Sequence, residues 1–317
     1  MLKYKIIANP TSGAGAGGRA IPKIERLLTQ RGLDFDLVRT QRQGHAIELA
    51  REAAEARFDV VVAAGGDGTA NEVINGLVAA RQAGINGLAL GLLGVGRGND
   101  FSSSVGVPHD LDKACQVLAE NYRRKIDIGR VTGGLYPQGR YFGNCVGVGF
   151  DAIGTIEVMK LPLWGGFLSF LIAVLRTIFL YDNAPLVTIE YDGNTLTQPS
   201  LLVSVMNGRR LGGGFYMAPH SEPDDGLFDL CIAHAVSKAR IFTLLPHFMK
   251  GTQFTQEPIT DGRASHISIT AVEGVLPAQT DGEIICIDGK HLEIELLPRY
   301  LEVVTQAPAV ATQGGGA

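Results

Sequence analysis

The sequence has few cysteines and none of the close spacings in which cysteines bind zinc. Only four occur among 317 residues, and they lie far apart, at Cys115, Cys145, Cys231 and Cys286. Without a Cys-x-x-Cys pair, neither a zinc site nor a disulfide scaffold is predicted. The four thiols are typical of reduced, buried cysteines in a cytoplasmic protein.

An excess of positive charge is also missing. Lysine and arginine number 28 against 32 acidic residues, which gives a net charge of −4 and a sequence pI of about 6.0. Wholesale nucleic-acid binding is therefore not expected, because a basic surface is missing. No Gly-x-x-x-x-Gly-Lys-Ser/Thr string occurs, so the chain is not a P-loop enzyme. We expect no signal peptide, because a strand pattern starts at once with Met1 to Ile7.

What the sequence does have is enough apolar material for two domains. Hydrophobic residues make up 45% of the chain and charged residues 19%. In the first half, strand and helix patterns alternate, which predicts a parallel sheet with helices on both faces. Ligands of such sheets bind at the carboxyl ends of the strands. The predicted strands are Tyr4 to Ala8, Phe35 to Arg39, Phe58 to Val62 and Leu88 to Leu93; the helices are Ala20 to Arg31, Gly44 to Ala56 and one that includes Val73 to Val78.

From about Lys125 the helix patterns become rare, and short apolar runs separated by turns follow. This pattern predicts a β-sandwich-like second domain. We expect domains at 1–125 and 126–291, and a disordered tail at 306–317. The predicted strands are Ile126 to Val131, Tyr141 to Val148, Leu186 to Tyr191, Leu201 to Met206, Phe228 to Ala233, Ala264 to Ala271 and Ile284 to Ile287.

The third predicted strand leads into a glycine-rich turn at residues 63–72. Its glycines allow a ligand close to the backbone, and the N–H groups of the following helix attract an anion. The alternative is an ordinary βα turn, in which the glycines serve only to let the chain turn tightly. Asp67 favours a ligand site, because a carboxylate crowded by backbone needs a partner.

Residues Gly65 to Val73 read Gly-Gly-Asp-Gly-Thr-x-Asn-Glu-Val without a gap. This string resembles the nucleotide-binding motif of the diacylglycerol kinase catalytic domain family, which includes bacterial lipid kinases and is related to sphingosine kinases. NAD kinases carry a shorter relative of it. The resemblance implies an NAD-kinase/phosphofructokinase-like α/β domain that binds ATP and Mg²⁺. The resemblance implies that the nucleotide is bound by residues of this string, namely Gly65, Gly66, Asp67, Gly68, Thr69, Asn71 and Glu72. It also implies contacts from Asn9 and Thr40, which lie at the same edge of the predicted sheet.

The fourth predicted strand ends in a second polar glycine loop, residues 94–101. The family has a Gly-Thr-Ala-Asn-Asp-Phe type string here, and Gly96, Asn99, Asp100 and Phe101 match it. Arg97 replaces the usual threonine or serine. Two interpretations stay open: the Arg97 guanidinium pairs with an ATP phosphate, or it points to solvent.

An acidic turn at residues 222–229 precedes a predicted strand. Hard cations take carboxylate and carbonyl oxygens. Bacterial lipid kinases similar to this sequence hold a structural Mg²⁺ at a matching string. The resemblance implies Asp225 as a side-chain ligand, with Glu222 and Leu227 giving backbone oxygens. The alternative is a hydrated turn without metal.

A late Asp281-Gly282-Glu283 string is by itself only a turn signal. In the resembling family, such a string supplies the general base, which implies that Glu283 takes the proton of the acceptor hydroxyl. Asp281 is then expected to orient the site or to hold Mg²⁺. The family also implies that the final run, 292–305, returns to the first domain.

The glycine-rich stretch that contains Arg209 and Arg210 resembles a stretch that faces the active cleft in the family. The alternative is a plain glycine loop without a role in the site.

The apolar segment Leu161 to Leu180 is the strongest candidate for contact with lipid. Pro162, the Gly165-Gly166 pair and Arg176 argue against a membrane span. A buried helix of the second domain is the favoured interpretation. A helix that lines a lipid pocket or enters the bilayer surface through Trp164, Phe167 and Phe170 comes next.

Together these features predict an ATP-dependent lipid kinase that transfers the γ-phosphate to a hydroxyl of a membrane lipid, with diacylglycerol as the preferred acceptor. Sphingoid bases, other lipid alcohols and phosphatidylglycerol are alternative acceptors, and NAD kinase is a further alternative. A nucleotide-binding regulator without catalysis is the alternative from another class. We expect a cytoplasmic protein in peripheral contact with membrane lipid and no nucleic-acid partner. The oligomeric state, a homodimer included, stays open.

Overall fold

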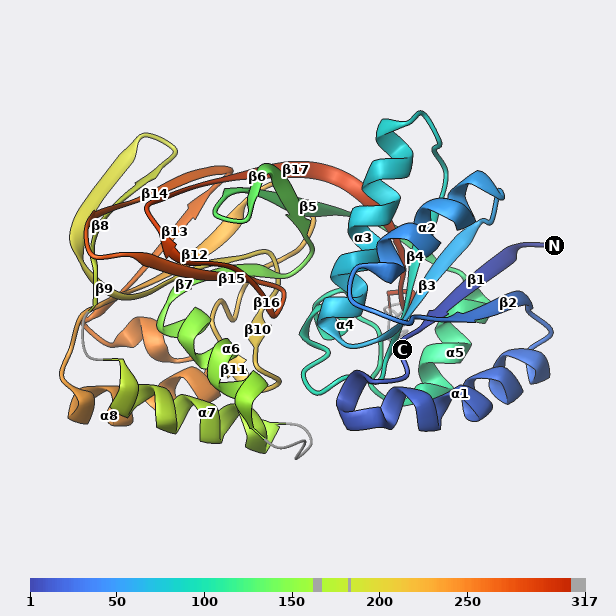
Figure 1. The fold of residues 1–317 in the computed structure, drawn as a ribbon, viewed down its shortest axis with the longest axis horizontal. Coiled ribbons are helices and arrows are strands. Elements are labelled where there is room, and N and C mark those ends of the chain that lie inside the picture. The colour runs from blue at the N-terminus through green and yellow to red at the C-terminus, as the bar shows by residue number, and fades with distance from the viewer. Residues whose placement is uncertain (162–166, 182–183, 309–317) are drawn as a thin grey trace, which may run out of the picture.

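The computed structural model describes residues 1–161, 167–181 and 184–308. Two units lie side by side in Figure 1: an α/β unit formed by the first part of the chain, and a β-rich unit with helices along one side. Pro162, Trp164, Gly165 and Gly166 lie outside the described residues, as does most of the expected tail, 309–317.

The α/β unit has a parallel sheet in the order β2-β1-β3-β4. Its central strands are buried throughout, since Val60, Val61 and Val62 have no exposed surface. Helices α2 and α3 pack together on one face and α1 and α5 on the other (Figure 1). The elements are β1 (Lys3–Ala8), α1 (Ser12–Gln30), β2 (Asp34–Arg39), α2 (His45–Glu55), β3 (Val60–Gly65), α3 (Asp67–Gln82), β4 (Ala89–Gly94), α4 (Asp100–Ser104) and α5 (Leu111–Glu120).

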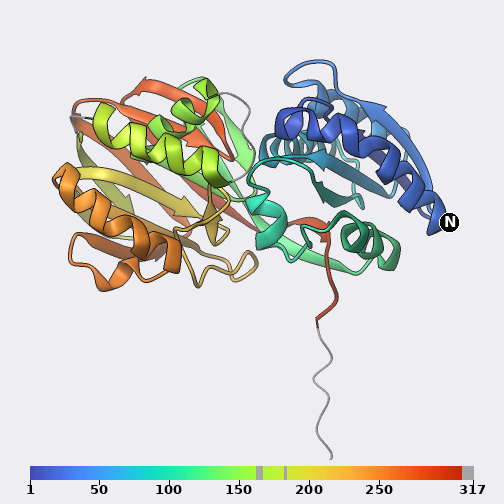
Figure 2. The same ribbon diagram turned by 90° about the horizontal axis from the view of Figure 1, so that it is seen from below.

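The β-rich unit is built from antiparallel pairs around an apolar core in which the rings of Phe142 and Phe228 stack at 5.5 Å. Helices α6, α7 and α8 lie along one side of these strands (Figure 2). The elements are β5 (Arg123–Gly133), β6 (Tyr136–Phe142), β7 (Cys145–Gly149), α6 (Phe150–Lys160), α7 (Phe167–Leu180), β8 (Leu186–Tyr191), β9 (Asn194–Met206), β10 (Arg210–Leu211), β11 (Phe215–Tyr216), β12 (Phe228–His234), α8 (Lys238–Lys250), η1 (Gln253–Thr255), β13 (Ile259–Ala264), β14 (His266–Glu273), β15 (Leu276–Thr280) and β16 (Glu283–Gly289).

The last strand, β17 (His291–Val304), joins the two units. Its first half pairs antiparallel with β14, and most of its length pairs with β5. Near its end, Glu302 pairs with Ala89, so that β17 runs parallel to β4. The C-terminal strand therefore completes the sheet of the α/β unit.

The structure corrects several expected elements. The strand expected from Tyr141 to Val148 breaks at residues 143–144, where the backbone N–H groups donate to Asp281 instead of a neighbouring strand. The strand expected over 264–271 divides at Ser265. Helices α6 and α8 lie where no helix was predicted. In α8 the helix contains Pro246, a residue that argues against a helix interior when only the sequence is read.

Helix α7 is the described part of the apolar segment. It buries Ser169, Ala173, Thr177 and Ile178 against the unit, while Leu168 and other large side chains face outward. Within the described ranges, no helix has the length and apolar character needed to cross a membrane.

Candidate active site

Two glycine loops from neighbouring strands meet at the carboxyl edge of the sheet. A β-carbon on Gly96 would lie 2.3 Å from Cα of Gly66, so the loops after β3 and β4 touch through bare backbone. Thr69 folds back beneath the turn, because a β-carbon on Gly65 would lie 2.4 Å from its Oγ1. The first N–H groups of α3 have no partner within the helix, and the glycines leave their backbone accessible, which is an arrangement that binds anions.

Asn9 and Thr40 lie at the same edge, as expected. Asn9 Nδ2 donates to Thr69 Oγ1 at 3.0 Å, and its Oδ1 accepts from the N–H of Thr11 at 3.0 Å. The N–H of Thr40 donates to the carbonyl of Ala8 at 2.8 Å. These bonds hold the ends of β1 and β2 beside the glycine turn.

The next two motif residues hold the framework. Glu72 accepts from the N–H groups of Gly44 at 2.8 Å and Ala46 at 3.0 Å, so both carboxylate oxygens hold the start of α2. Asn71 Nδ2 donates to Asp281 Oδ2 at 3.0 Å and links α3 to the β-rich unit. The structure thus gives Glu72 a positioning role and makes Asn71 a bridge between the units.

Two carboxylates face each other across Gly98. A β-carbon on Gly98 would lie 3.0 Å from Asp67 Oδ2 and 2.9 Å from Asp100 Oδ2. Asp67 Oδ1 accepts from the N–H of Phe101 at 3.0 Å, and Asp100 Oδ2 from the N–H of Gly213 at 2.9 Å. Asp100 Oδ1 is buried and has no hydrogen-bond partner among the described residues. Burial, followed by the charge of Asp100, raises the pKa of Asp67 to about 7.

The loop after β4 also contacts the β-rich unit. Asn99 adopts a left-handed backbone (φ 55°), and its Oδ1 accepts from the N–H of Gly96 at 2.8 Å. The Arg97 guanidinium lies 3.5 Å from the carbonyl of Val158 on α6, and both interpretations of this residue stay open. The loop with Arg209 and Arg210 faces the site, since its Gly213 contacts Asp100.

Asp281 is held from all sides. Its carboxylate accepts hydrogen bonds from Asn71 Nδ2 and from the N–H groups of Gly143 (2.8 Å), Asn144 (3.0 Å) and Cys145 (2.9 Å). A carboxylate offers about four acceptor positions, so these donors occupy them. Of the two expected roles, the geometry supports orienting the site and leaves no oxygen free for Mg²⁺.

Glu283 begins β16 and lies beside the glycine turn. Its Oε2 accepts from Arg140 at 2.8 Å, and the two side chains are only 12% and 9% exposed. A β-carbon on Gly68 would lie 3.9 Å from Glu283 Oε1. Burial raises the pKa of Glu283, the Arg140 guanidinium opposes this, and the charges of Glu72 and Asp281 add to it. Glu283 is thus a carboxylate of raised basicity at the junction of the two units.

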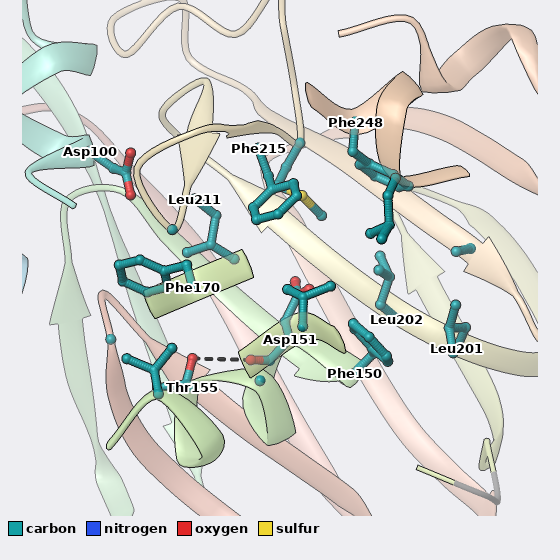
Figure 3. Close-up of a pocket in the computed structure, with 18 of the residues that line it drawn as sticks. Asp100, Phe150, Asp151, Thr155, Phe170, Leu201, Leu202, Leu211, Phe215 and Phe248 are labelled. Atoms are coloured by element: carbon teal, nitrogen blue, oxygen red, sulfur yellow. Dashed lines mark hydrogen bonds between the residues drawn. The ribbon is translucent and has the colours of Figure 1, made fainter. Parts of the chain in front are cut away.

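An apolar cavity of about 180 Å³ opens from this junction into the β-rich unit (Figure 3). Asp67, Asp100 and Asp281 are among the residues that line it. The remaining wall is formed mainly by apolar side chains of α6, α7, α8 and β9, among them Phe150, Phe170, Leu202 and Phe248. The cavity is shaped for an apolar molecule whose polar end lies near the carboxylates.

The acidic turn lies away from this cavity and is neutralised by arginines. Asp224 forms a bidentate pair with Arg124, with distances of 2.7 and 2.6 Å. Asp225 pairs with Arg263 and also accepts from the N–H of Leu227 at 3.1 Å, and Glu222 pairs with Arg209. Each Asp225 oxygen thus accepts one hydrogen bond, and two of the carboxylate's acceptor positions stay open. The Mg²⁺ site predicted at Asp225, Glu222 and Leu227 therefore stays a prediction.

The pair of carboxylates at Asp67 and Asp100 also suits a cation. Asp100 Oδ1 is buried and has no hydrogen-bond partner among the described residues. Both carboxylates lie close to Gly98, and carboxylate oxygens are ligands that Mg²⁺ prefers. Among the described residues no group of three or more His, Cys, Asp and Glu side chains gathers as a metal cluster. A hard cation here would therefore need further oxygens from a ligand such as a phosphate.

Sequence analysis missed Arg140 and Asn144. Asn144 Nδ2 donates to the carbonyl of Arg210 at 3.0 Å, and its Oδ1 accepts from Ser104 Oγ at 3.2 Å, so it ties β7 to the first unit. Neither residue belongs to a motif, and no local pattern marks them. Only contacts between distant parts of the chain reveal their roles.

A glycine turn of the kind that binds anions, a buried carboxylate beside it and an apolar cavity are together typical of a kinase for apolar acceptors. Residues 3–131 match the family model described as the diacylglycerol kinase catalytic domain, and residues 144–305 match the YegS C-terminal NAD kinase beta sandwich-like domain. The chain belongs to the diacylglycerol kinase catalytic domain family and is a lipid kinase. The predicted family and fold class are thereby confirmed.

Curated relatives and solved structures agree with this assignment. The chain is 32% identical to a diacylglycerol kinase of Bacillus subtilis over 89% of this chain and 90% of that protein. It is 28% identical to a diacylglycerol kinase of Staphylococcus carnosus, covering 89% and 88%. A crystal structure of a Bacillus anthracis protein superposes with a TM-score of 0.77 at 27% identity, covering 97% of this chain and 98% of that one.

Proposed function

We propose that this lipid kinase transfers the γ-phosphate of ATP to a hydroxyl of a membrane lipid. Diacylglycerol, which would yield phosphatidic acid, is the first acceptor to test, because the curated relatives are named for it. The observation that carries the proposal is the approach of Glu283 to the bare backbone of Gly68. It places a carboxylate of one unit opposite the anion-binding turn of the other.

In this proposal the ATP phosphates lie against the turn from Gly65 to Thr69. The free N–H groups of α3 and its dipole favour their negative charge. Asp67 and Asp100 would hold Mg²⁺, which when bound neutralises charge on the phosphates. Glu72 and Asn9 hold the neighbouring loops, so the turn is formed before the nucleotide arrives.

Glu283 takes the proton of the acceptor hydroxyl as its oxygen forms a bond to the γ-phosphorus. The bond between that phosphorus and the bridging oxygen breaks at the same centre, and ADP leaves. Arg140 orients Glu283 and lowers its pKa, which keeps a fraction of the carboxylate ionised despite its burial. Asp281 fixes the turn just before Glu283.

Peripheral contact with a membrane is supported by the outer surface of the helices that surround the cavity. Six large apolar side chains on α6, α7 and α8 are exposed: Met159, Leu168, Phe179, Leu180, Phe242 and Met249. The inner faces of the same helices line the cavity. Insertion of the outer side chains into the headgroup layer would bring lipid tails to the entrance.

The proposal is tested by transfer of radiolabelled γ-phosphate from ATP to dioleoylglycerol in mixed micelles. We expect a labelled lipid with the native chain and a loss of about 10²–10⁴ in kcat with Glu283→Gln, the range that a general base contributes. The matched control is Glu295→Gln, at a surface pair with Arg130. Full activity of E283Q would show that Glu283 is not the general base. If no lipid alcohol received phosphate from the native chain, the proposed transfer would be wrong.

A further inference from the structure

A second cavity, of about 270 Å³, lies at the amino edge of the parallel sheet. Residues 86–88, which lead into β4, form one wall, and residues 299–302 of β17 form another. The last turn of α3 contributes a third wall through Arg81. Gly68 and Arg81 lie in the first and last turns of the 16-residue α3, about 20 Å apart. The cavity is therefore separate from the candidate active site.

Three basic side chains from three different elements line this cavity: Arg81 on α3, Lys125 on β5 and Arg299 on β17. None of them forms an ion pair with a residue that the structure describes. Glu302, an acidic side chain of the wall, pairs with Arg123 at 3.0 Å, which offsets its charge. The cavity thus carries an excess of positive charge.

Arg81 is held in place by Tyr300. Its Nη1 donates to the carbonyl of Tyr300, and its guanidinium lies 4.0 Å from the centre of the Tyr300 ring. A guanidinium has five N–H donors, so most of them stay available. Arg81 is therefore oriented at the cavity before a ligand arrives.

Arg299 has a backbone conformation that glycine would adopt at lower cost. Its φ is 47°, in the left-handed region, and its N–H donates to Asp127 Oδ1 at 2.6 Å. Asp127 is fully buried and also accepts from the N–H of Gly226 at 2.8 Å, so it fixes this part of β17. Strained residues of this kind gather at functional sites. A role for the side chain, which lines the cavity, explains why an arginine stands here.

We propose that this cavity is a binding site for a small phosphate monoester, held by Arg81, Lys125 and Arg299. Guanidinium groups bind phosphate oxygens in pairs, and an ammonium adds a compact charge. A phosphate monoester carries a charge of about −1.5 to −2 at neutral pH, which suits three cations. Part of the wall is apolar, with Leu77 and Ile85, so the cavity also suits a short carbon chain on the phosphate.

Two sources share this chemistry: a dissolved ester and the headgroup of a phosphorylated lipid. Figure 1 shows the C-terminal end of α3 at the top and helices α7 and α8 along the bottom. The cavity thus lies away from the helices that we propose to contact the membrane, which favours the dissolved ester. The inference goes beyond the proposed function and does not depend on phosphoryl transfer.

Calorimetric titration with glycerol 3-phosphate, at constant ionic strength and without ATP or Mg²⁺, tests the site. The variants are Arg299→Gly and Lys125→Gln. The matched control is Arg57→Gly, because Arg57 is also exposed and left-handed (φ 58°) and does not line the cavity. Each titration is repeated in the Gly68→Ala background, which removes the anion site proposed at the glycine turn.

We expect the native chain and R57G to bind with the same affinity, and R299G and K125Q to bind more weakly by about tenfold or more. Glycerol 3-phosphate should raise the Tm of the native chain and of R57G, and that of R299G much less. Without ligand, R299G should melt close to the native temperature, because glycine accepts the left-handed backbone without strain. Equal binding by R299G, K125Q and R57G would overturn the site.

Dihexanoyl phosphatidic acid, below its micelle concentration, tests the other source. If it binds more tightly than glycerol 3-phosphate and R299G weakens that binding, the ligand is a lipid headgroup; the opposite preference identifies a dissolved ester. Both outcomes support the site.

The two proposals fail in different ways. If glycerol 3-phosphate binds as expected but no lipid alcohol receives phosphate, the site stands and the proposed function is wrong. If lipid is phosphorylated but R299G and R57G bind the ester alike, the proposed function stands and the site is overturned.

Discussion

Gly68 and Glu283 face each other across the junction of the two units, with 3.9 Å between Glu283 Oε1 and the place where a β-carbon of residue 68 would be. The glycine belongs to the turn that begins α3, and the glutamate begins β16. The missing side chain leaves the space in which phosphate and acceptor hydroxyl would meet. We therefore expect substitutions on the glycine side to change nucleotide binding and substitutions on the glutamate side to change proton transfer.

Gly68→Ala should abolish nucleotide binding without destabilising the protein. Gly68 lies in the first turn of α3, its backbone is not left-handed, and an added methyl has no neighbour closer than 3.9 Å. Alanine in a helix is favoured over glycine by about 0.5–1 kcal/mol, so Tm should stay or rise. The methyl would, however, occupy the phosphate position. Calorimetric titration with ATP checks the affinity.

Gly76→Ala is the matched control on the same helix. A β-carbon there would lie 2.5 Å from the carbonyl of Ile47 and 2.6 Å from Cβ of Ala50, where α2 packs against α3. We expect a lower Tm, by a cost of about 1–3 kcal/mol, with ATP affinity retained below the melting range. Equal ATP affinity for G68A and the native chain would contradict the assignment of the turn.

Arg140→Gln should move the acid limb of the pH–activity profile to higher pH. Arg140 lowers the pKa of Glu283 against the effect of burial, so its removal raises that pKa further. Because the base must be ionised, activity then falls off at a higher pH than in the native chain. Arg130→Gln removes a surface arginine paired with Glu295 and should leave the profile in place. An unshifted R140Q profile would show that Glu283 is not the titrating base.

Asp67→Asn should stabilise the ligand-free protein at alkaline pH. The pKa of Asp67 is about 7 in the folded chain, against about 3.9 in an unfolded one. Between these values the folded state binds more protons, so stability falls as pH rises from about 4 to 7, by up to about 4 kcal/mol. D67N avoids this loss. Its Tm should exceed the native value by several degrees at pH 8, and the gap should close toward pH 4.

The same variant tests the cation site. If Asp67 and Asp100 hold Mg²⁺, millimolar MgCl₂ should raise the Tm of the native chain and not that of D67N, because binding to the folded state stabilises it. Asp36→Asn, at the exposed pair with Lys5, is the control and should respond like the native chain. A similar Mg²⁺ response from D67N would place the cation elsewhere.

Asp281→Asn should lower stability and activity together. Three backbone N–H groups point at the carboxylate oxygens, and an amide nitrogen in that place would face donors. The expected cost is about 1–3 kcal/mol for each group left unsatisfied. Thermal unfolding measures it, with Asp288→Asn, at an exposed position of β16, as the control. If Asp281 served only to hold Mg²⁺, the variant would melt at the native temperature without added metal.

Most of the α/β unit could be predicted from local pattern. The buried run that ends at Gly65, the glycines after it and the apolar spacing of α3 lie next to one another in the chain, so the sequence alone predicts strand, turn and helix. The same is true of β8, whose bounds match the prediction. Helices α6 and α8 could not be found this way, because their burial depends on the cavity and strands that they cover.

The sequence by itself determined the family, the two-unit organisation and the glycine turn, because these are written in contiguous residues. Only the tertiary structure decided which polar groups act and which support them. The pair of Arg140 and Glu283 spans 143 positions, and the bond from Asn71 to Asp281 spans 210. Side chains so far apart in the chain carry no local signal of their contact. Burial and pairing, which set their charge and orientation, arise only when the two units pack together.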